Sequence, residues 1–226
     1  MTELLVAPCD FDAAKYAVMR WHYSRAMPAG KLVKFGVWES GRFVGVVLFG
    51  RGANNHMAMP YGLDMTELAE LVRVALTDHV TPVTQIVAEA LRQLRDTNPG
   101  LRLVISFADP DQDHHGGIYQ AGNWIYTGMS ISAPEYIVNG RRLHGRTMRS
   151  QWRADPNSEQ YESAEAWARA VLDPAAHHVM GSSKFRYLMP LDRGMRRQIE
   201  KLRETPPTPA DLAALRQTDE QQLVTD

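Results

Sequence analysis

Residues 101–109, with the sequence Leu-Arg-Leu-Val-Ile-Ser-Phe-Ala-Asp, form a short apolar run that ends on a carboxylate. The run is centred on Val104 and Ile105, and its length and composition predict a buried β-strand. The turn-forming residues Asn98-Pro99-Gly100 precede it. Asp109 therefore directly follows the C-terminal end of a predicted strand, which is where open α/β sheets place their ligands.

The segments around this strand alternate between predicted helices and strands. Residues 84–94 place their apolar side chains on one face, which predicts an amphipathic helix. The Val- and Phe-rich runs 32–38 and 42–49, joined by a turn with Gly41, predict a β-hairpin. Further strands are expected at 68–76 (where a helix is the alternative), 124–131 and 135–138, and further helices at 11–20, 115–121, 162–172 and 194–203. This order predicts an α/β fold with a mixed central sheet flanked by helices.

Composition excludes several classes of protein. A single cysteine, Cys9, in 226 residues excludes an internal disulfide framework and a Cys-rich zinc module. No apolar stretch approaches the roughly 20 residues of a membrane helix, and the first residues lack the pattern of a signal peptide. We therefore expect a cytoplasmic protein with no membrane partner.

The neutral total charge hides a basic segment. Residues 141–203 contain 13 Lys and Arg against 7 Asp and Glu, although the whole chain has a formal net charge of -1. Arginines interleaved with an aromatic residue suit nucleic-acid phosphates and bases. A solvated basic face without a partner is the alternative. The arginines concentrate between residues 141 and 153, where no acidic residue occurs: Arg141, Arg142, Arg146, Arg149 and Arg153.

Seven short motifs occur in a characteristic order along residues 15–195. They are His22-Tyr23-Ser24, Phe35-Gly36-Val37-Trp38 with Phe43-Val44-Gly45, Glu70-Leu71-Val72-Arg73, Ser106-Phe107-Ala108-Asp109, His115-Gly116-Gly117-Ile118-Tyr119-Gln120-Ala121, Asn123-Trp124-Ile125-Tyr126-Thr127-Gly128, and Lys184-Phe185-Arg186-Tyr187. As a set, they resemble the phage Mom DNA-modification family, a divergent branch of the GCN5-related N-acetyltransferase fold.

This resemblance implies a function. Members of the family add a carbamoylmethyl (acetamido-type) group to adenine N6 in duplex DNA, which protects phage DNA from host restriction. The implied protein is an adenine-modifying transferase of the GCN5-related superfamily that acts on double-stranded DNA in the cytoplasm of the infected cell. The group donor is left open, and so is a homodimer. Two alternatives are a CoA-dependent N-acetyltransferase for a small amine or protein, and a non-catalytic DNA-binding module on the same fold.

The segment after the strand at 68–76 departs from ordinary acetyltransferases. Those enzymes have a glycine-rich loop here that cradles the CoA pyrophosphate at a helix N-terminus. Residues 77–84 contain no glycine, and Asp78 lies where the pyrophosphate would approach. The sequence thus argues against acetyl-CoA as the donor. Iron or another metal stays open, with His22 as the one candidate ligand.

Four residues are predicted to be catalytic. With the resemblance, Asp109 is the general base for the weakly nucleophilic N6 amine, with helix N-capping as its alternative. Tyr119 is the general acid or holds the acyl oxygen, with core packing as its alternative. His22 is a proton shuttle or metal ligand, with capping and packing at the end of a helix as its alternative. Arg73 either binds an anionic or carbonyl group or is paired structurally. In a regular strand, Glu70 and Arg73 would face opposite sides because they are three residues apart.

The remaining candidate residues bind ligands in this interpretation. The substrate-binding candidates are Tyr23, Ser24, Glu70, Ser106, Asn123 and Tyr126. The DNA-binding candidates are Arg141, Arg142, Arg146, Arg149, Arg153, Lys184 and Arg186. The expected domains are a catalytic domain at 1–195 and a peripheral, helical, Pro-containing acidic tail at 196–226.

Overall fold

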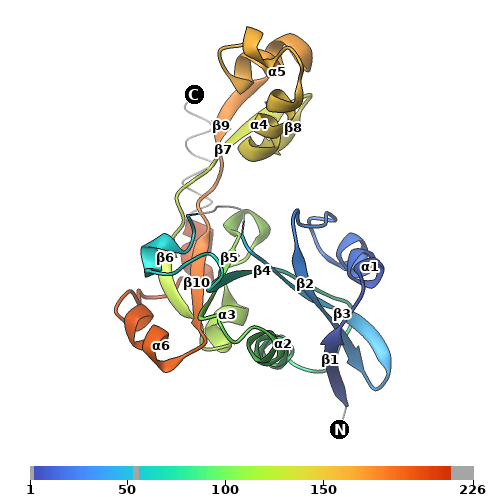
Figure 1. The fold of residues 1–226 in the computed structure, drawn as a ribbon, viewed down its shortest axis with the longest axis vertical. Coiled ribbons are helices and arrows are strands. Elements are labelled where there is room, and N and C mark those ends of the chain that lie inside the picture. Colours follow the sequence, from blue (N-terminus) through green and yellow to red (C-terminus); the bar gives the residue numbers. More distant parts are fainter. Residues whose placement is uncertain (1–2, 53–55, 215–226) are drawn as a thin grey trace. The chain divides into compact units, whose positions relative to one another are not determined.

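The computed structural model describes residues 3–52 and 56–214, and these residues form two compact units (Figure 1). The first, here called the sheet unit, comprises the described residues up to Ala108, His114–Gly128 and those from Phe185 onward. The second, the insert unit, comprises Asp109–Asp113 and Met129–Lys184. The insert unit therefore interrupts the sheet unit in sequence, and the chain divides differently from the boundary expected at residue 195. Residues 215–226 of the expected tail lie outside the described residues.

A seven-stranded mixed sheet forms the sheet unit, which confirms the predicted α/β class. Its strands, in spatial order, are β1 (Leu4–Pro8), β2 (Leu32–Glu39), β3 (Arg42–Gly50), β4 (Leu68–Leu76), β5 (Leu103–Ala108), β10 (Phe185–Pro190) and β6 (Ile125–Met129). The segment 68–76 is a strand, so its helical alternative is wrong.

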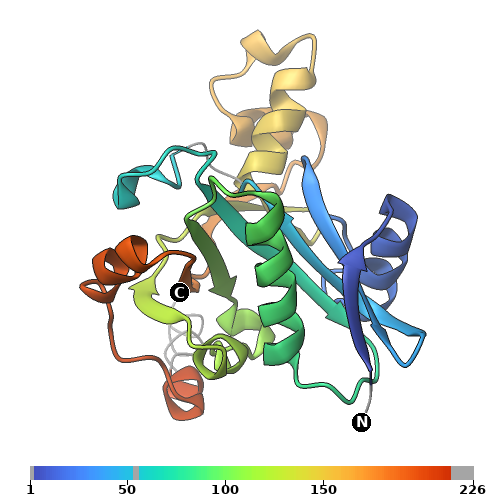
Figure 2. The same cartoon turned by 60° about the horizontal axis from the view of Figure 1, so that its bottom comes forward.

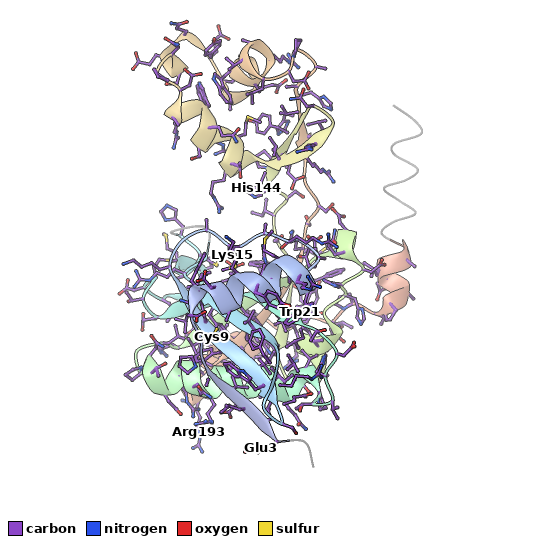
Figure 3. All side chains as sticks on the ribbon, turned by 90° about the vertical axis from the view of Figure 1, so that its right-hand side faces the viewer. Glu3, Cys9, Lys15, Trp21, His144 and Arg193 are labelled. Atoms are coloured by element: carbon purple, nitrogen blue, oxygen red, sulfur yellow. The ribbon has the colours of Figure 1, made fainter. Side chains whose placement is uncertain are left out.

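Helices cover both faces of this sheet. Successive side chains of a strand point to opposite faces, and both faces of this sheet carry apolar side chains. Val47 and Phe49 of β3 pack with α2 (Val83–Thr97), whereas Val46 and Leu48 pack with α1 (Phe11–Trp21). Figure 2 shows α2 lying across the sheet, and Figure 3 shows α1, with Trp21 at its end. The short helix α3 (Gly117–Ala121) follows β5, and α6 (Arg193–Glu200) follows β10.

The described part of the tail packs on the sheet unit. Met195 and Ile199 of α6 are fully buried, and Leu212 belongs to the main hydrophobic core. The backbone carbonyl of Pro207 accepts a hydrogen bond from the Gln120 side chain at 3.0 Å. Apolar burial therefore attaches residues 195–212 to the sheet unit, whereas the sequence predicts a peripheral tail.

The parallel pair β4–β5 separates toward its C-terminal end. Only three residue pairs align, from Leu68↔Leu103 to Glu70↔Ile105, although both strands continue beyond them. β4 also carries a bulge against β3, since Leu48 pairs with Arg73 and Phe49 with Leu71, which leaves Val72 unmatched. The opening between the two strands and the bulge together position the site described below.

The insert unit has its own sheet and core. Its antiparallel strands are ordered β8 (Arg141–His144), β7 (Pro134–Val138) and β9 (His177–Met180), and its helices are α4 (Gly145–Ala154) and α5 (Ala164–Val171). The core contains Tyr136, Val138, Met148, Ala164, Trp167, Ala168 and Ala176. Asn139 and Gly140 both have positive φ, at 50° and 70°, which confirms the predicted hairpin turn. No helix among the described residues is long and apolar enough to span a membrane.

Candidate active site

The segment that ends α1 places an imidazole in a partly buried position. His22 follows the last residue of α1, and its Nδ1 accepts the backbone N–H of Ser24 at 3.1 Å. The same Nδ1 lies 2.8 Å from Ser24 Oγ. The neutral ring therefore carries its proton on Nε2. The His22 and Tyr23 rings pack with their centroids 4.2 Å apart, and Tyr23 meets His114 edge-on at 5.5 Å.

The charge state of His22 is set by its surroundings. Burial, followed by the electrostatic effects of Arg73 and of His114, lowers the pKa of His22 to about 4. The imidazole is therefore neutral at pH 7 and able to accept a proton. Residues 22, 73 and 114 are far apart in sequence, so no local pattern predicts that they interact.

The bulge in β4 changes the prediction for Glu70 and Arg73. Because Val72 is the extra residue, Arg73 takes the place that Val72 would have in a regular strand. Glu70 and Arg73 therefore lie on the same face of the sheet, and the expectation of opposite faces is wrong. The Arg73 Nη1 donates to the carbonyl of Val72 at 2.6 Å. Its Nε is buried and has no hydrogen-bond partner among the described residues.

Tyr119 reaches the opening between β4 and β5 from α3. Its hydroxyl lies 2.8 Å from Ser106 Oγ, which is also 2.9 Å from the carbonyl oxygen of Leu71 on β4. The Tyr119 ring stacks on Tyr187 at 5.0 Å. Burial raises the pKa of Tyr119 to about 12, and the nearby Glu70 carboxylate acts in the same direction. The phenol is thus protonated at neutral pH and can donate a proton or a hydrogen bond.

Gly116 makes this position of α3 possible. It caps the helix with a φ of +87°, and a Cβ there would lie 2.2 Å from the Tyr187 ring. Only glycine combines this backbone conformation with so close an approach. The glycine of the sequence motif therefore has a packing role beside Tyr119.

Asp109 belongs to the insert unit and is already engaged. Its Oδ1 accepts the backbone N–H of Asp111 at 3.1 Å and caps the short helix Pro110–Gln112. Its Oδ2 is 2.6 Å from Lys184 Nζ. Capping, which sequence reasoning held as the alternative, is therefore present together with an ion pair. The assignment of Asp109 as a base stays a prediction.

Two further substrate candidates differ in their surroundings. Tyr126 is only 8% exposed and packs on Phe185 and Tyr187, so its side chain belongs to the core rather than to a ligand surface. Asn123 is exposed with a φ of 62°, and its carbonyl accepts from Arg196. Its side chain is available to a ligand only from the solvent side.

Three predicted DNA-binding side chains are held by protein groups. Arg142 pairs with Glu135 at 2.9 Å, and Lys184 pairs with Asp109. Arg186 donates to Thr127 Oγ1 at 3.0 Å and to the Thr127 carbonyl at 2.5 Å, so its guanidinium ties β10 to β6. The charged end of each of these side chains therefore already has a protein partner. Four arginines remain exposed: Arg141, Arg146, Arg149 and Arg153.

The loop after β4 does not fit a CoA pyrophosphate. The Glu39 carboxylate, at the end of β2, accepts the backbone N–H groups of Val80 at 2.9 Å and of Thr81 at 2.6 Å. Hydrogen bonds from the Thr81 side chain and from these two amides lower the pKa of Glu39 to about 2. An internal anion therefore uses the amides that a pyrophosphate would need. Sequence reasoning missed Glu39, since nothing in its local pattern indicates this contact.

The described residues also contain no group of three or more His, Cys, Asp or Glu side chains arranged to hold a metal ion. His22 is thus a candidate metal ligand with no accompanying ligand set among the described residues.

Comparison with known proteins identifies similar sequences and folds. The model of the Mom protein family matches residues 3–209, which confirms the resemblance found in the motifs. The methylcarbamoylase mom of Escherichia phage Mu is 26% identical over 212 residues, which cover 92% of this chain and 84% of that protein.

Two acyl-transferring proteins are among the similar solved structures. An aminoglycoside acetyltransferase, AAC(6')-Ib, solved with coenzyme A and kanamycin, has a TM-score of 0.49 at 7% identity, covering 88% of this chain and 98% of that chain. FeeM, an N-acyl amino acid synthase from uncultured soil microbes, has a TM-score of 0.45 at 11% identity, covering 89% and 97%.

Proposed function

The chain belongs to the Mom protein family, and from this premise we propose that it is a transferase that adds a carbamoylmethyl group to adenine N6 in duplex DNA. The relative from phage Mu carries the name methylcarbamoylase, which fits transfer of such a group. The modified phage DNA would then resist host restriction. The observation that carries the proposal is the buried Arg73 Nε with no described partner, next to a neutral imidazole.

Arg73 is assigned to bind the oxygen of the transferred group. A buried guanidinium N–H without an acceptor is costly, roughly 1–3 kcal/mol or more for a charged group. Such donors are rare in native proteins and call for an explanation. A carboxamide or carbonyl oxygen placed against Nε would satisfy this donor.

Proton transfer is assigned to the neighbouring side chains. When the new N6–C bond forms, the bond from the transferred carbon to its leaving group breaks and N6 must lose a proton. His22 can take a proton because its pKa of about 4 keeps it neutral. Tyr119 can give one to the leaving group because its pKa of about 12 keeps it protonated. Asp109 is retained as a second candidate base, and Tyr23 is assigned to stack on the extruded adenine.

A CoA-dependent N-acetyltransferase is the weaker alternative. The contacts of Glu39 with the Val80 and Thr81 amides argue against it. Isothermal calorimetry with acetyl-CoA separates the two functions: we expect no binding heat, and tight binding would favour the acetyltransferase.

The test is mass spectrometry of nucleosides from the DNA of cells that express the chain. We expect a new adenosine species with the added mass of a carbamoylmethyl group. The Tyr119→Phe variant keeps the ring that stacks on Tyr187 but loses the hydroxyl, so the yield should fall by roughly 10²–10⁴-fold, as for a general acid. No new species from the wild-type chain, or full yield from the variant, would contradict the proposal or the role of Tyr119, respectively.

A further inference from the structure

The exposed face of α4 in the insert unit concentrates positive charge. Arg146, Arg149 and Arg153 are all exposed, and their spacing places them within about one sixth of the helix circumference. Met148 and Trp152, on the opposite side of the helix, belong to the insert core or pack against it. The helix thus buries one face and presents a row of guanidinium groups on the other.

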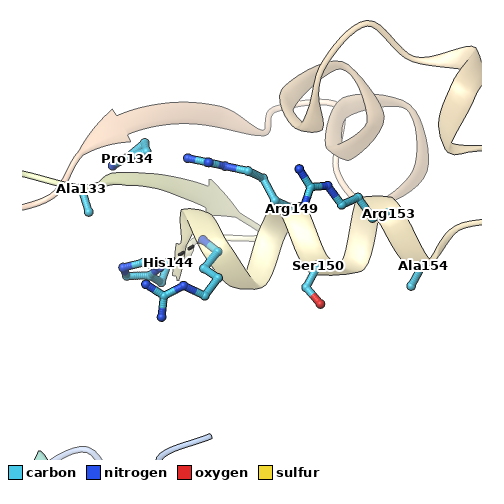
Figure 4. A pocket seen from close by; sticks show the side chains of 8 residues that line it. Ala133, Pro134, His144, Arg149, Ser150, Arg153 and Ala154 are labelled. Atoms are coloured by element: carbon cyan, nitrogen blue, oxygen red, sulfur yellow. Dashed lines mark hydrogen bonds between the residues drawn. The ribbon is translucent and has the colours of Figure 1, made fainter. Parts of the chain in front are cut away.

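This face is hollowed and lacks acidic side chains. Ala133, Pro134, His144, Arg146, Arg149, Ser150, Arg153 and Ala154 line a depression of about 700 Å³ (Figure 4). Nearby carboxylates are engaged elsewhere: Glu135 pairs with Arg142, and Asp155 accepts from the Trp167 indole at 2.8 Å. Within the described part of the chain, no ion pair involves the three arginines. The row therefore has no internal counter-charge.

The start of α4 adds to the positive field. His144 Nδ1 caps the helix by accepting the backbone N–H of Arg146 at 3.1 Å. Burial and then the charge of Arg146 lower the pKa of His144. Lys184 and Arg149 lower it as well, whereas Glu135 raises it. The positive end of the helix dipole thus lies beside the arginine row.

We propose that the α4 face, formed by Arg146, Ser150, Arg149 and Arg153 with His144 at its end, is the surface through which the insert unit binds the phosphate backbone of duplex DNA. The row from Arg146 to Arg153 extends about 10 Å along the helix, close to the rise of three nucleotides of one strand. Guanidinium groups bind phosphates bidentately. This inference rests on the proposed function for the choice of DNA as the polyanion.

The assignment is narrower than the basic segment of the sequence. Arg142, Lys184 and Arg186 are excluded, because protein groups already hold their charged ends. Arg141 lies on β8, outside the depression. Sequence alone could not divide the segment in this way.

The experiment measures binding of the full-length chain to a fluorescent DNA duplex between 50 and 200 mM salt. The test variant replaces Arg146, Arg149 and Arg153 by Gln. The control replaces Arg193, Arg197 and Lys201 by Gln, which removes the same charge from exposed positions on or next to α6. We expect the test variant to bind at least ten-fold more weakly at the lowest salt. The magnitude of its slope of log K against log salt should fall by about 2–3. The control should keep both the affinity and the slope near their wild-type values.

Each outcome decides the assignment. Equal binding by the test variant and wild type overturns it, and so does an equal loss in the control. The loss of binding counts only if the far-UV circular dichroism of the test variant stays near that of wild type. If the test variant unfolds, the single substitutions Arg149→Gln and Arg153→Gln replace it. Each should change the slope of log K against log salt by about 0.9. Binding is read without any modification step. A wild-type chain that binds DNA through α4 but yields no modified adenosine would therefore contradict the proposed function and leave this inference standing.

Discussion

At the scale of single residues, the ionisation states in the site are set by burial and by neighbours from distant segments. Burial and the nearby Arg73 and His114 lower the pKa of His22 to about 4, so its imidazole is neutral at pH 7. Desolvation and the nearby Glu70 raise the pKa of Tyr119 to about 12, so its phenol stays protonated. The imidazole is therefore in the form that can accept a proton and the phenol in the form that can donate one, which are the protonation states that a general base and a general acid need.

The role of Asp109 can be tested at this same scale. Asp109→Asn keeps an oxygen that can cap Pro110–Gln112 but removes the negative charge beside Lys184. If Asp109 is the base, this variant should lose roughly 10²-fold or more of the modification rate. Its stability should change by no more than about 1 kcal/mol, because the Lys184 side chain is 44% exposed and exposed ion pairs contribute little.

Lys184→Met is the matched variant, since it removes the same ion pair and leaves the carboxylate in place. We expect it to retain most of the modification rate in the nucleoside assay. Equal losses in both variants would show that Asp109 acts through the ion pair and not as a base.

At the scale of secondary-structure elements, small irregularities bring the functional groups together. The bulge at Val72 turns Arg73 to the face of Glu70, and the early end of the β4–β5 pairing makes room for the hydroxyl contact of Ser106 and Tyr119. Bulges next to active sites commonly redirect a side chain in this way. The loop after β4 is likewise held by an element distant in sequence, since Glu39 ends β2.

The Glu39 contact predicts a pH dependence of stability. Its pKa is about 2 in the folded protein against an ordinary value of 4.5. The stability from this group is therefore fully present above about pH 4.5 and is lost as the pH falls toward 2. Glu39→Gln should lower the thermal unfolding midpoint at pH 7, and the difference from wild type should shrink between pH 4.5 and 2.

The measurement is thermal unfolding followed by circular dichroism across this pH range. Asp78→Asn is the control, because it changes an exposed carboxylate in the same loop. A constant difference between Glu39→Gln and wild type from pH 7 to pH 2 would rule out the proposed linkage.

At the scale of the whole molecule, the chain has two units with cores of very different size. Seven buried residues form the core of the insert unit, whereas the largest core cluster of the sheet unit alone contains 21. Because burial of apolar surface is the main stabilising contribution, the insert unit should open at a lower free energy than the sheet unit. The family match over residues 3–209 spans both units.

Native-state hydrogen exchange can test this difference. We expect amides of β7, α4 and α5 to exchange through an opening of lower free energy than those of β3 and α2. Duplex DNA should raise protection within residues 144–154. Exchange of both units through one common opening would contradict their independence.

Much of the fold could be predicted from sequence because the signals are local. Apolar periodicity identified α2 and the β2–β3 hairpin, and Asn139-Gly140 identified the β7–β8 turn. Ordered motifs were enough to identify the family. The residue types of the site, above all His22, Arg73 and Tyr119, were also chosen from these motifs.

Only the tertiary structure decided how those residues are paired. Glu70 and Arg73 share a face because of a register shift between β3 and β4, which leaves no mark on local periodicity. Lys184 and Arg186 are held by protein groups, whereas no ion pair among the described residues involves Arg146, Arg149 or Arg153. Local sequence determines which elements form, because turns and hydrogen-bonded periods depend on near neighbours. The surroundings of each charged group come from contacts between residues tens of positions apart, which exist only once the chain has packed.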